Sequence, residues 1–227
     1  GDIVVVRPGE RLPVDGVVIE GNYIGTLADG SDPGAGLRAD HGIELTGGSA
    51  TIRDNIVAYT EEGGMLIGST ATITGNELYS NSMLSVTGDG ISTEGTTGQA
   101  ISITGNRIDD TSAYGIETWN ATGPFTIEHN TVSNSGIGGG VEIGGIRIFG
   151  TGSTVRYNVS TGAIGAGIAV TQTAGANSQN LISKNSTYGN LGLSIDVDVT
   201  GFVSPNGDGV TPNDGATNAG LPNNAMD

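Results

Sequence analysis

An asparagine recurs along this chain at intervals of 21 to 33 residues, each time three positions after an aliphatic residue. The seven pairs are Ile19/Asn22, Ile52/Asn55, Ile73/Asn76, Ile103/Asn106, Ile127/Asn130, Val155/Asn158 and Ile182/Asn185. A glycine followed by an apolar residue alternates with this mark, at Gly42-Ile43, Gly64-Met65, Gly90-Ile91, Gly115-Ile116, Gly145-Ile146, Gly167-Ile168 and Gly192-Leu193. Two alternating marks indicate a solenoid in which each repeat forms one coil.

The residues around each asparagine alternate between apolar and polar, which is typical of half-buried strands on either side of a turn. The second residue after most of the asparagines is aliphatic, whereas Ser160 and Thr187 stand there in the last two repeats. Frequent glycine and β-branched residues oppose a helix. We therefore predict an all-β fold, a parallel β-solenoid of about seven coils spaced ~4.8 Å apart, in a rod roughly 35 Å long.

Composition limits the partners of this chain. Its 227 residues include 41 glycines and no cysteine, which excludes disulfides and thiolate metal sites. Without a period, so much glycine would indicate disorder. Eight Lys and Arg against 24 Asp and Glu give a net charge of −16, which argues against nucleic-acid and anionic-membrane partners. The apolar runs are all shorter than the ~18 residues of a membrane-spanning helix, so we expect no membrane insertion.

Stacking gives the asparagines a structural interpretation. At a tight corner, asparagine tolerates left-handed backbone, and its amide can bond the neighbouring backbone or the asparagine of the next coil. We therefore assign a structural ladder to Asn22, Asn55, Asn76, Asn106, Asn130, Asn158 and Asn185. Five tyrosines lie within four residues of these positions. We favour packing of their rings on the coil below over exposed sugar-stacking platforms: Tyr23, Tyr59, Tyr79, Tyr157 and Tyr188.

Several segments resemble the right-handed parallel β-helix repeats of the pectate-lyase-like superfamily, as found in bacterial surface and secreted proteins. They include Ile73-Thr74-Gly75-Asn76, Ile103-Thr104-Gly105-Asn106 and Leu181-Ile182-Ser183-Lys184-Asn185. The resemblance implies a right-handed β-helix over residues 22–200, followed by an acidic Gly/Asn/Asp-rich tail over 201–227. It is specific for the fold and weak for the activity, because the superfamily contains lyases, hydrolases, adhesins and structural modules.

The first residues carry a second resemblance. The stretch Gly1-Asp2-Ile3-Val4-Val5-Val6-Arg7-Pro8-Gly9-Glu10 and the residues up to Val18 resemble part of the actuator domain of heavy-metal P-type ATPases. The Thr-Gly-Glu loop of that family is missing, so nothing in the chain supports ATP hydrolysis. A chimera, an artificial sequence and coincidence stay open as explanations. The alternative interpretation of residues 1–21 is a β-hairpin that caps the first coil.

Catalytic candidates are few. Lyases of the superfamily use aspartates that hold calcium and a basic residue that removes a proton, and its glycosidases use pairs of aspartates. The positions that could serve are the adjacent Asp109 and Asp110, with His129 and Arg147 one and two repeats later. They lack the surrounding motifs of either enzyme, so we favour surface turns for the aspartates and a ladder corner for His129. We interpret His41, in Asp40-His41-Gly42, as a turn residue.

The tail offers a candidate calcium site. Oxygen donors lie close together at Asn206, Asp208, Asn213 and Asp214, with Asp196 and Asp198 upstream. Calcium accepts 6 to 8 oxygen ligands, and the lack of a bidentate glutamate predicts weak affinity, about 10⁻⁴ to 10⁻³ M. The alternative is a solvated acidic tail.

These features favour a non-catalytic structural or binding module that is secreted or displayed at a cell surface, although the sequence holds no signal peptide. We expect a monomer whose partner is a polysaccharide or another cell-surface ligand. One alternative is a polysaccharide lyase or glycosidase acting on an acidic polysaccharide. The other is a chimeric or designed sequence without a biological function.

Overall fold

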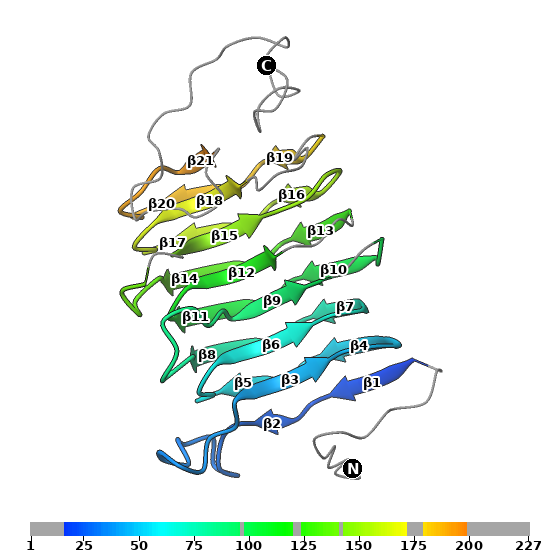
Figure 1. Ribbon diagram of the computed structural model, residues 1–227, viewed down its shortest axis with the longest axis vertical. Helices are drawn as coiled ribbons and strands as arrows, with labels where there is room; N and C mark the ends of the chain where they lie inside the picture. The colour runs from blue at the N-terminus through cyan, green and yellow to red at the C-terminus, as the bar shows by residue number, and fades with distance from the viewer. Residues whose placement is uncertain (1–15, 96–97, 120–123, 141–142, 172–178, 199–227) are drawn as a thin grey trace.

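The computed structural model describes residues 16–95, 98–119, 124–140, 143–171 and 179–198. Within these ranges the chain forms 21 β-strands in three parallel sheets of seven strands each (Figure 1). Each coil contributes one strand to each of the sheets, which we name A, B and C in chain order. The predicted all-β solenoid of about seven coils is confirmed.

The strands have the following bounds. Sheet A consists of β1 (Val17–Glu20), β4 (Ser49–Arg53), β7 (Thr70–Thr74), β10 (Ile101–Thr104), β13 (Phe125–Glu128), β16 (Thr154–Arg156) and β19 (Leu181–Ser183). Sheet B consists of β2 (Tyr23–Ile24), β5 (Ile56–Ala58), β8 (Glu77–Asn81), β11 (Arg107–Thr111), β14 (Thr131–Ser135), β17 (Val159–Thr161) and β20 (Ser186–Tyr188). Sheet C consists of β3 (His41–Leu45), β6 (Gly63–Ile67), β9 (Ile91–Glu94), β12 (Tyr114–Trp119), β15 (Gly144–Ile148), β18 (Ala166–Thr171) and β21 (Ile195–Asp198).

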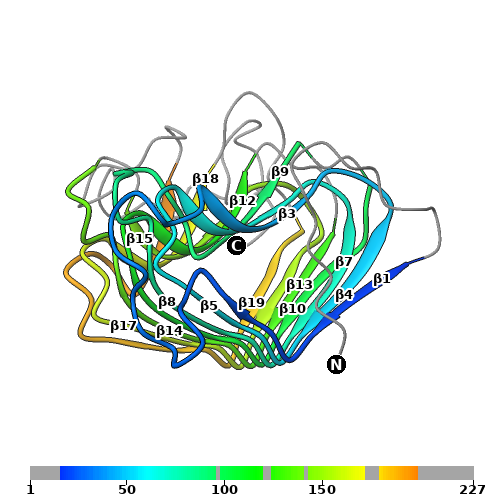
Figure 2. The ribbon, with the colours of Figure 1, turned by 90° about the horizontal axis from the view of Figure 1, so that it is seen from below.

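The aliphatic residues of the repeat form the core of the solenoid. Parallel pairing in register stacks the residue three positions before each ladder asparagine into one column, Ile19, Ile52, Ile73, Ile103, Ile127, Val155 and Ile182. Sheets B and C supply columns of their own, headed by Ile24 and Ile43. Seen along the axis, sheets A and B meet at one corner and sheet C lies opposite that corner (Figure 2). The three inward faces therefore share one apolar interior.

The solenoid begins earlier than the sequence predicted. Strand β1 pairs in parallel with β4, and Ile19 lies in register with Ile52, so residues 17–20 belong to the first coil and not to a separate hairpin cap. The reason is the apolar alternation of Val17 and Ile19, which matches the inward face of sheet A. The rest of the proposed cap, residues 1–15, and the tail from residue 199 onward lie outside the described residues.

The predicted asparagine ladder is confirmed at the corner between sheets A and B. Each ladder asparagine from Asn22 to Asn158 donates its backbone N–H and its side-chain Nδ2–H to Oδ1 of the next, at 2.9 to 3.0 Å. From Asn55 onward, Nδ2 also donates to the carbonyl of the aliphatic core residue one coil earlier, such as Ile19 for Asn55 and Ile73 for Asn106. The asparagine of one coil is therefore bonded to the aliphatic residue that precedes the asparagine of the coil before.

The left-handed backbone at this corner belongs to the residue before each asparagine, which corrects our expectation. These residues have φ between 55° and 69°: Gly21, Asp54, Gly75, Gly105, His129, Tyr157 and Lys184. The ladder asparagines themselves do not have positive φ. They are needed for their side-chain amides, which donate and accept hydrogen bonds along the axis. Three of the seven corners use glycine, where left-handed φ carries no Cβ penalty.

Steric crowding explains why glycine recurs at the start of the sheet C strands. A Cβ added to Gly115 would lie 2.2 Å from Cγ1 of Val132, and the same collision with a sheet B side chain recurs at Gly42, Gly64, Gly90 and Gly145. In these five coils the entry to the sheet C strand thus passes too close to sheet B for a side chain. In the last coil the register of Ile168 with Ile195 puts Ser194 in this column, so the assignment of Gly192 to the mark was wrong.

The coils differ in length only in some of their connections. The A-to-B corner has two residues between its strands in every coil, whereas the B-to-C connection runs from two residues in the fourth coil to the 16 of Gly25–Asp40 in the first. This explains why the asparagine intervals vary while the register does not. Among the residues that the structure places, there is no helix with the length and apolar character needed to cross a membrane.

Removal of a central ladder amide should destabilise the fold. In Asn106→Ala, the buried backbone and side-chain donors of Asn76 lose their acceptor and the carbonyl of Ile73 loses a donor. We expect a loss of at least about 2 kcal/mol in the free energy of unfolding, because each unsatisfied buried group costs ~1–3 kcal/mol. Urea denaturation would measure it. The control is Asn22→Ala, at the exposed end of the ladder, and equal losses in the two variants would contradict a cooperative ladder.

The glycine column gives a second prediction. Gly115→Ala should lower the free energy of unfolding by about 1–3 kcal/mol, because Val132 must move to admit the new methyl group. Gly47→Ala is the matched control, since an added Cβ there meets nothing within 4 Å. Thermal melts of both variants decide the point, and a Gly115→Ala variant as stable as Gly47→Ala would refute the steric explanation.

Candidate functional site

The adjacent aspartates lie on sheet B and bond to neighbouring coils. Asp109 accepts hydrogen bonds from Oγ of Ser133 at 2.7 Å and from Nδ2 of Asn134 at 2.9 Å. Asp110 accepts one from Oγ of Ser80 at 2.9 Å and has φ of 59°. Left-handed residues recur at this end of sheet B, at Tyr59, Ser80 and Asn134 among others, so Asp110 occupies a second corner of the coil.

The structure does not bring the four candidate catalytic residues together. His129 stands at the A-to-B corner, where its ring stacks on that of Tyr157 with centroids 4.9 Å apart. Arg147 lies on β15 in sheet C with its side chain fully buried, bonded to Glu117. Asp109 and Asp110 are at the far end of sheet B. These residues therefore lie in three separate places and do not form one catalytic site.

The proposed calcium ligands Asn206, Asp208, Asn213 and Asp214 lie outside the described residues. Of the two upstream aspartates, Asp196 is on β21 and is buried, and Asp198 ends the same strand. Within the described ranges, no three Asp, Glu or His side chains converge in a way that could hold a metal ion. The calcium site stays a prediction about the tail.

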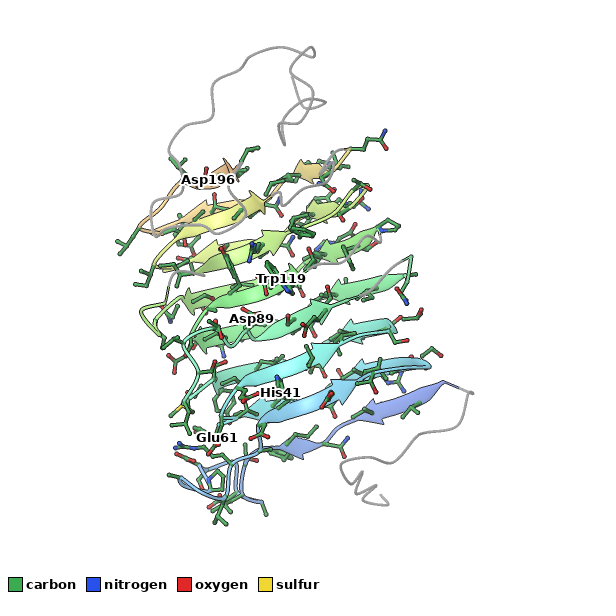
Figure 3. The ribbon with its side chains drawn as sticks, in the orientation of Figure 1. His41, Glu61, Asp89, Trp119 and Asp196 are labelled. Carbon is green, nitrogen blue, oxygen red and sulfur yellow. The ribbon has the colours of Figure 1, made fainter. Side chains whose placement is uncertain are left out.

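A groove with a volume of about 490 Å³ runs along the outer face of sheet C. It crosses the first four coils and is lined by His41, Glu62, Gly63, Met65, Leu66, Ser85, Thr87, Gly88, Asp89, Ser92, Glu94, Glu117 and Trp119. Figure 3 shows His41, Asp89 and Trp119 on this one face. The groove therefore lies opposite the asparagine corner.

Strand register builds the floor of the groove. Leu66 on β6, Ser92 on β9 and Glu117 on β12 are consecutive partners across the sheet. Their side chains face outward because the residues beside them, such as Ile116, face the core. Trp119 and its partner Glu94 lie two residues further along the same strands, so they too face outward.

A buried arginine holds part of this floor in place. Nη1 of Arg147 donates to Oε1 of Glu117 at 2.6 Å, and the guanidinium lies 4.9 Å from the ring centroid of Trp119 and 5.5 Å from that of Tyr114. Phe149 packs against Trp119 with centroids 5.9 Å apart. Both the indole and the carboxylate are thus positioned by side chains outside the groove.

The groove is acidic. Its lining contains the four carboxylates of Glu62, Asp89, Glu94 and Glu117, and its one basic side chain is His41, whose Nδ1 lies 3.9 Å from Glu62. Asp89 accepts the backbone N–H of Tyr114 at 2.8 Å, which fixes its carboxylate at the wall. The described residues contribute no lysine or arginine to the lining.

Sequence reasoning missed this groove. His41 begins β3 and is not in a turn, because its strand pairs with β6 from the first residue. Trp119 and the carboxylates were not singled out, although a signal existed. The residue after the apolar member of each glycine mark points outward from sheet C, and this position reads Glu44, Leu66, Ser92, Glu117, Arg147 and Ala169.

The tyrosines divide between packed and exposed rings. Tyr59 and Tyr79 pack edge to face with centroids 5.6 Å apart, and burial raises the pKa of Tyr79. Tyr23 and Tyr188, at the two ends of sheet B, are 60% and 59% exposed, so the packing that we favoured was wrong for these two rings. Terminal coils offer such rings a neighbour on one side only.

Comparison with known families gives one match. A family model described as "Right handed beta helix region" matches residues 11–158 and 41–200, which together span 11–200. No curated protein and no solved structure matched the chain. The matched range includes all three sheets and the groove.

Loss of the buried arginine should be costly. We expect Arg147→Met to lower the free energy of unfolding by about 3–5 kcal/mol, because it leaves the carboxylate of Glu117 buried without its cation. The double variant Arg147→Met/Glu117→Gln should recover much of that loss. Urea denaturation of Arg147→Met, Glu117→Gln and the double variant gives the coupling energy between the two residues. Strictly additive losses in the free energy of unfolding would contradict the pairing.

Proposed function

The chain belongs to the right-handed β-helix family, and on that premise we propose that it is a non-catalytic glycan-binding module, secreted or displayed at a cell surface. The ligand is a polysaccharide chain that lies in the groove over sheet C. The family itself covers many functions, so the proposal rests on the site.

The observation that carries the proposal is the placement of Trp119 beside hydrogen-bonding groups on a concave face. Sugar rings have apolar faces and hydroxyl edges, so they fit a site that combines an aromatic ring with carboxylates and hydroxyls. Glu94 is the register partner of Trp119, and Ser92 lies on the floor beside Glu117. Ser85 and Thr87 add hydroxyls along the wall.

The groove is suited to a chain and not to a compact ligand. Its lining residues come from four successive coils, so at ~4.8 Å per coil it extends roughly 15 Å along the axis. The floor is made of strands held in register, which leaves little to order when the ligand binds.

A second candidate function is hydrolysis of the bound glycan. Asp89 and Glu117 are buried whereas Glu62 and Glu94 are exposed, and carboxylates in unlike environments are what a glycosidase needs for its acid and its base. An acidic polysaccharide fits less well as a substrate, because the carboxylates of the groove would repel its own.

Truncation of the tryptophan tests the proposal. We expect Trp119→Ala to weaken binding of glycan hexamers at least about tenfold, because the variant removes the indole from the groove lining. Isothermal titration with neutral and amino-sugar hexamers measures the effect. Tyr23→Ala is the control, since Tyr23 is an exposed aromatic on sheet B.

Two outcomes would count against this function. If wild type and Trp119→Ala bound every hexamer equally, the groove would not be the binding site. If prolonged incubation released new reducing ends and Glu117→Gln abolished the release, the protein would be a glycosidase and not a binding module. We expect no release of reducing ends from any hexamer or from polygalacturonate.

A further inference from the structure

The groove carries charge of one sign on both of its walls. Glu62 and Asp89 lie on the side of the B-to-C connections, and Glu94 lies beside Trp119 at the other ends of the sheet C strands. Arg147 pairs with Glu117 from the next coil and His41 lies 3.9 Å from Glu62, and the described residues contribute no lysine or arginine to the lining. A cleft lined by one sign of charge focuses the field and concentrates ligands of the opposite sign. The chain as a whole, at −16, reinforces this field.

Two of the carboxylates, those of Glu62 and Glu94, are exposed where a ligand can reach them. The side chain of Glu62 is 61% exposed, and Glu94 is exposed as well. On sheets A and B, three glutamates are paired with an arginine of the next coil: Glu20 with Arg53 at 2.9 Å, Glu77 with Arg107 at 2.8 Å and Glu128 with Arg156 at 2.7 Å. These glutamates therefore have cations supplied by the next coil, whereas the groove lining contains no lysine or arginine.

We propose that the groove is selective for an amino glycan, a chain of glucosamine residues whose free amines are protonated. The inference rests on the proposed function and adds the ligand class. The sugar faces use Trp119, and the ammonium groups pair with Glu62 and Glu94 on the two walls. A neutral glycan makes the first contact without the second, and an acidic glycan is repelled.

Isothermal titration of the whole chain with three hexamers tests this selectivity: glucosamine hexamer, its fully N-acetylated form, and a galacturonate hexamer. The pH is kept mildly acidic, so that the amines are protonated and the carboxylates ionised. We expect the glucosamine hexamer to bind at least about fivefold more tightly than the N-acetylated one, from one or more exposed charge pairs. The galacturonate hexamer should bind most weakly, and added salt should weaken only the glucosamine hexamer.

The double variant Glu62→Gln/Glu94→Gln should bring the affinity for the glucosamine hexamer down to that for the N-acetylated hexamer. The control is Glu20→Gln/Glu77→Gln, which removes the same charge from sheets A and B and should retain the preference.

The possible failures are distinguishable. Equal affinity of the wild type for the glucosamine and N-acetylated hexamers would overturn the selectivity while leaving the glycan-binding function standing. No binding of any hexamer would overturn both. Spermidine binding as tightly as the glucosamine hexamer would overturn the amino-glycan assignment, because charge alone would then explain the affinity. Thermal melts of each variant establish that it is folded.

Discussion

The hydrogen bonds of the asparagine ladder fix the geometry on which the rest of this protein depends. A two-residue corner leaves backbone groups that water cannot reach. The amide of each asparagine after the first accepts the backbone N–H of the asparagine one coil earlier and donates to a core carbonyl of that same coil, as Asn106 does with Asn76 and Ile73. Because every corner has the same two-residue length, sheets A and B cannot slip relative to one another. The register of the isoleucine column follows from this constraint.

A rigid corner on one side permits variation on the other. The connections that enter and leave sheet C differ from coil to coil, yet the glycine column keeps each sheet C strand at the same distance from sheet B. The outward positions of sheet C are consequently held in fixed columns while their chemistry changes along the axis. Such a surface combines a rigid scaffold with variable side chains, which is the usual arrangement at binding sites.

The candidate site uses this freedom in a specific way. Arg147 is buried on the outside of the sheet and not in the core, and its contacts hold Glu117 and Trp119 in place. Polar groups with this degree of burial require partners, and here the partners are supplied by neighbouring coils in register. The acidity of the groove is therefore compatible with a stable sheet, because the most buried of its carboxylates accept hydrogen bonds from Arg147 of the next coil or from a backbone N–H.

The sequence by itself determined the fold class, the number of coils and the asparagine ladder, because these features repeat and a repeat is visible without coordinates. It misplaced the left-handed residue and the first strand, since both depend on local backbone geometry at single positions. Beyond the outward column of sheet C, the groove was out of its reach for a different reason. His41, Asp89 and Trp119 belong to different repeats and share no pattern, and only the stacking of coils brings them onto one face. A ladder requires the same residue in every coil, whereas a binding site requires different residues in adjacent coils, and the position of those residues in space is decided by tertiary register alone.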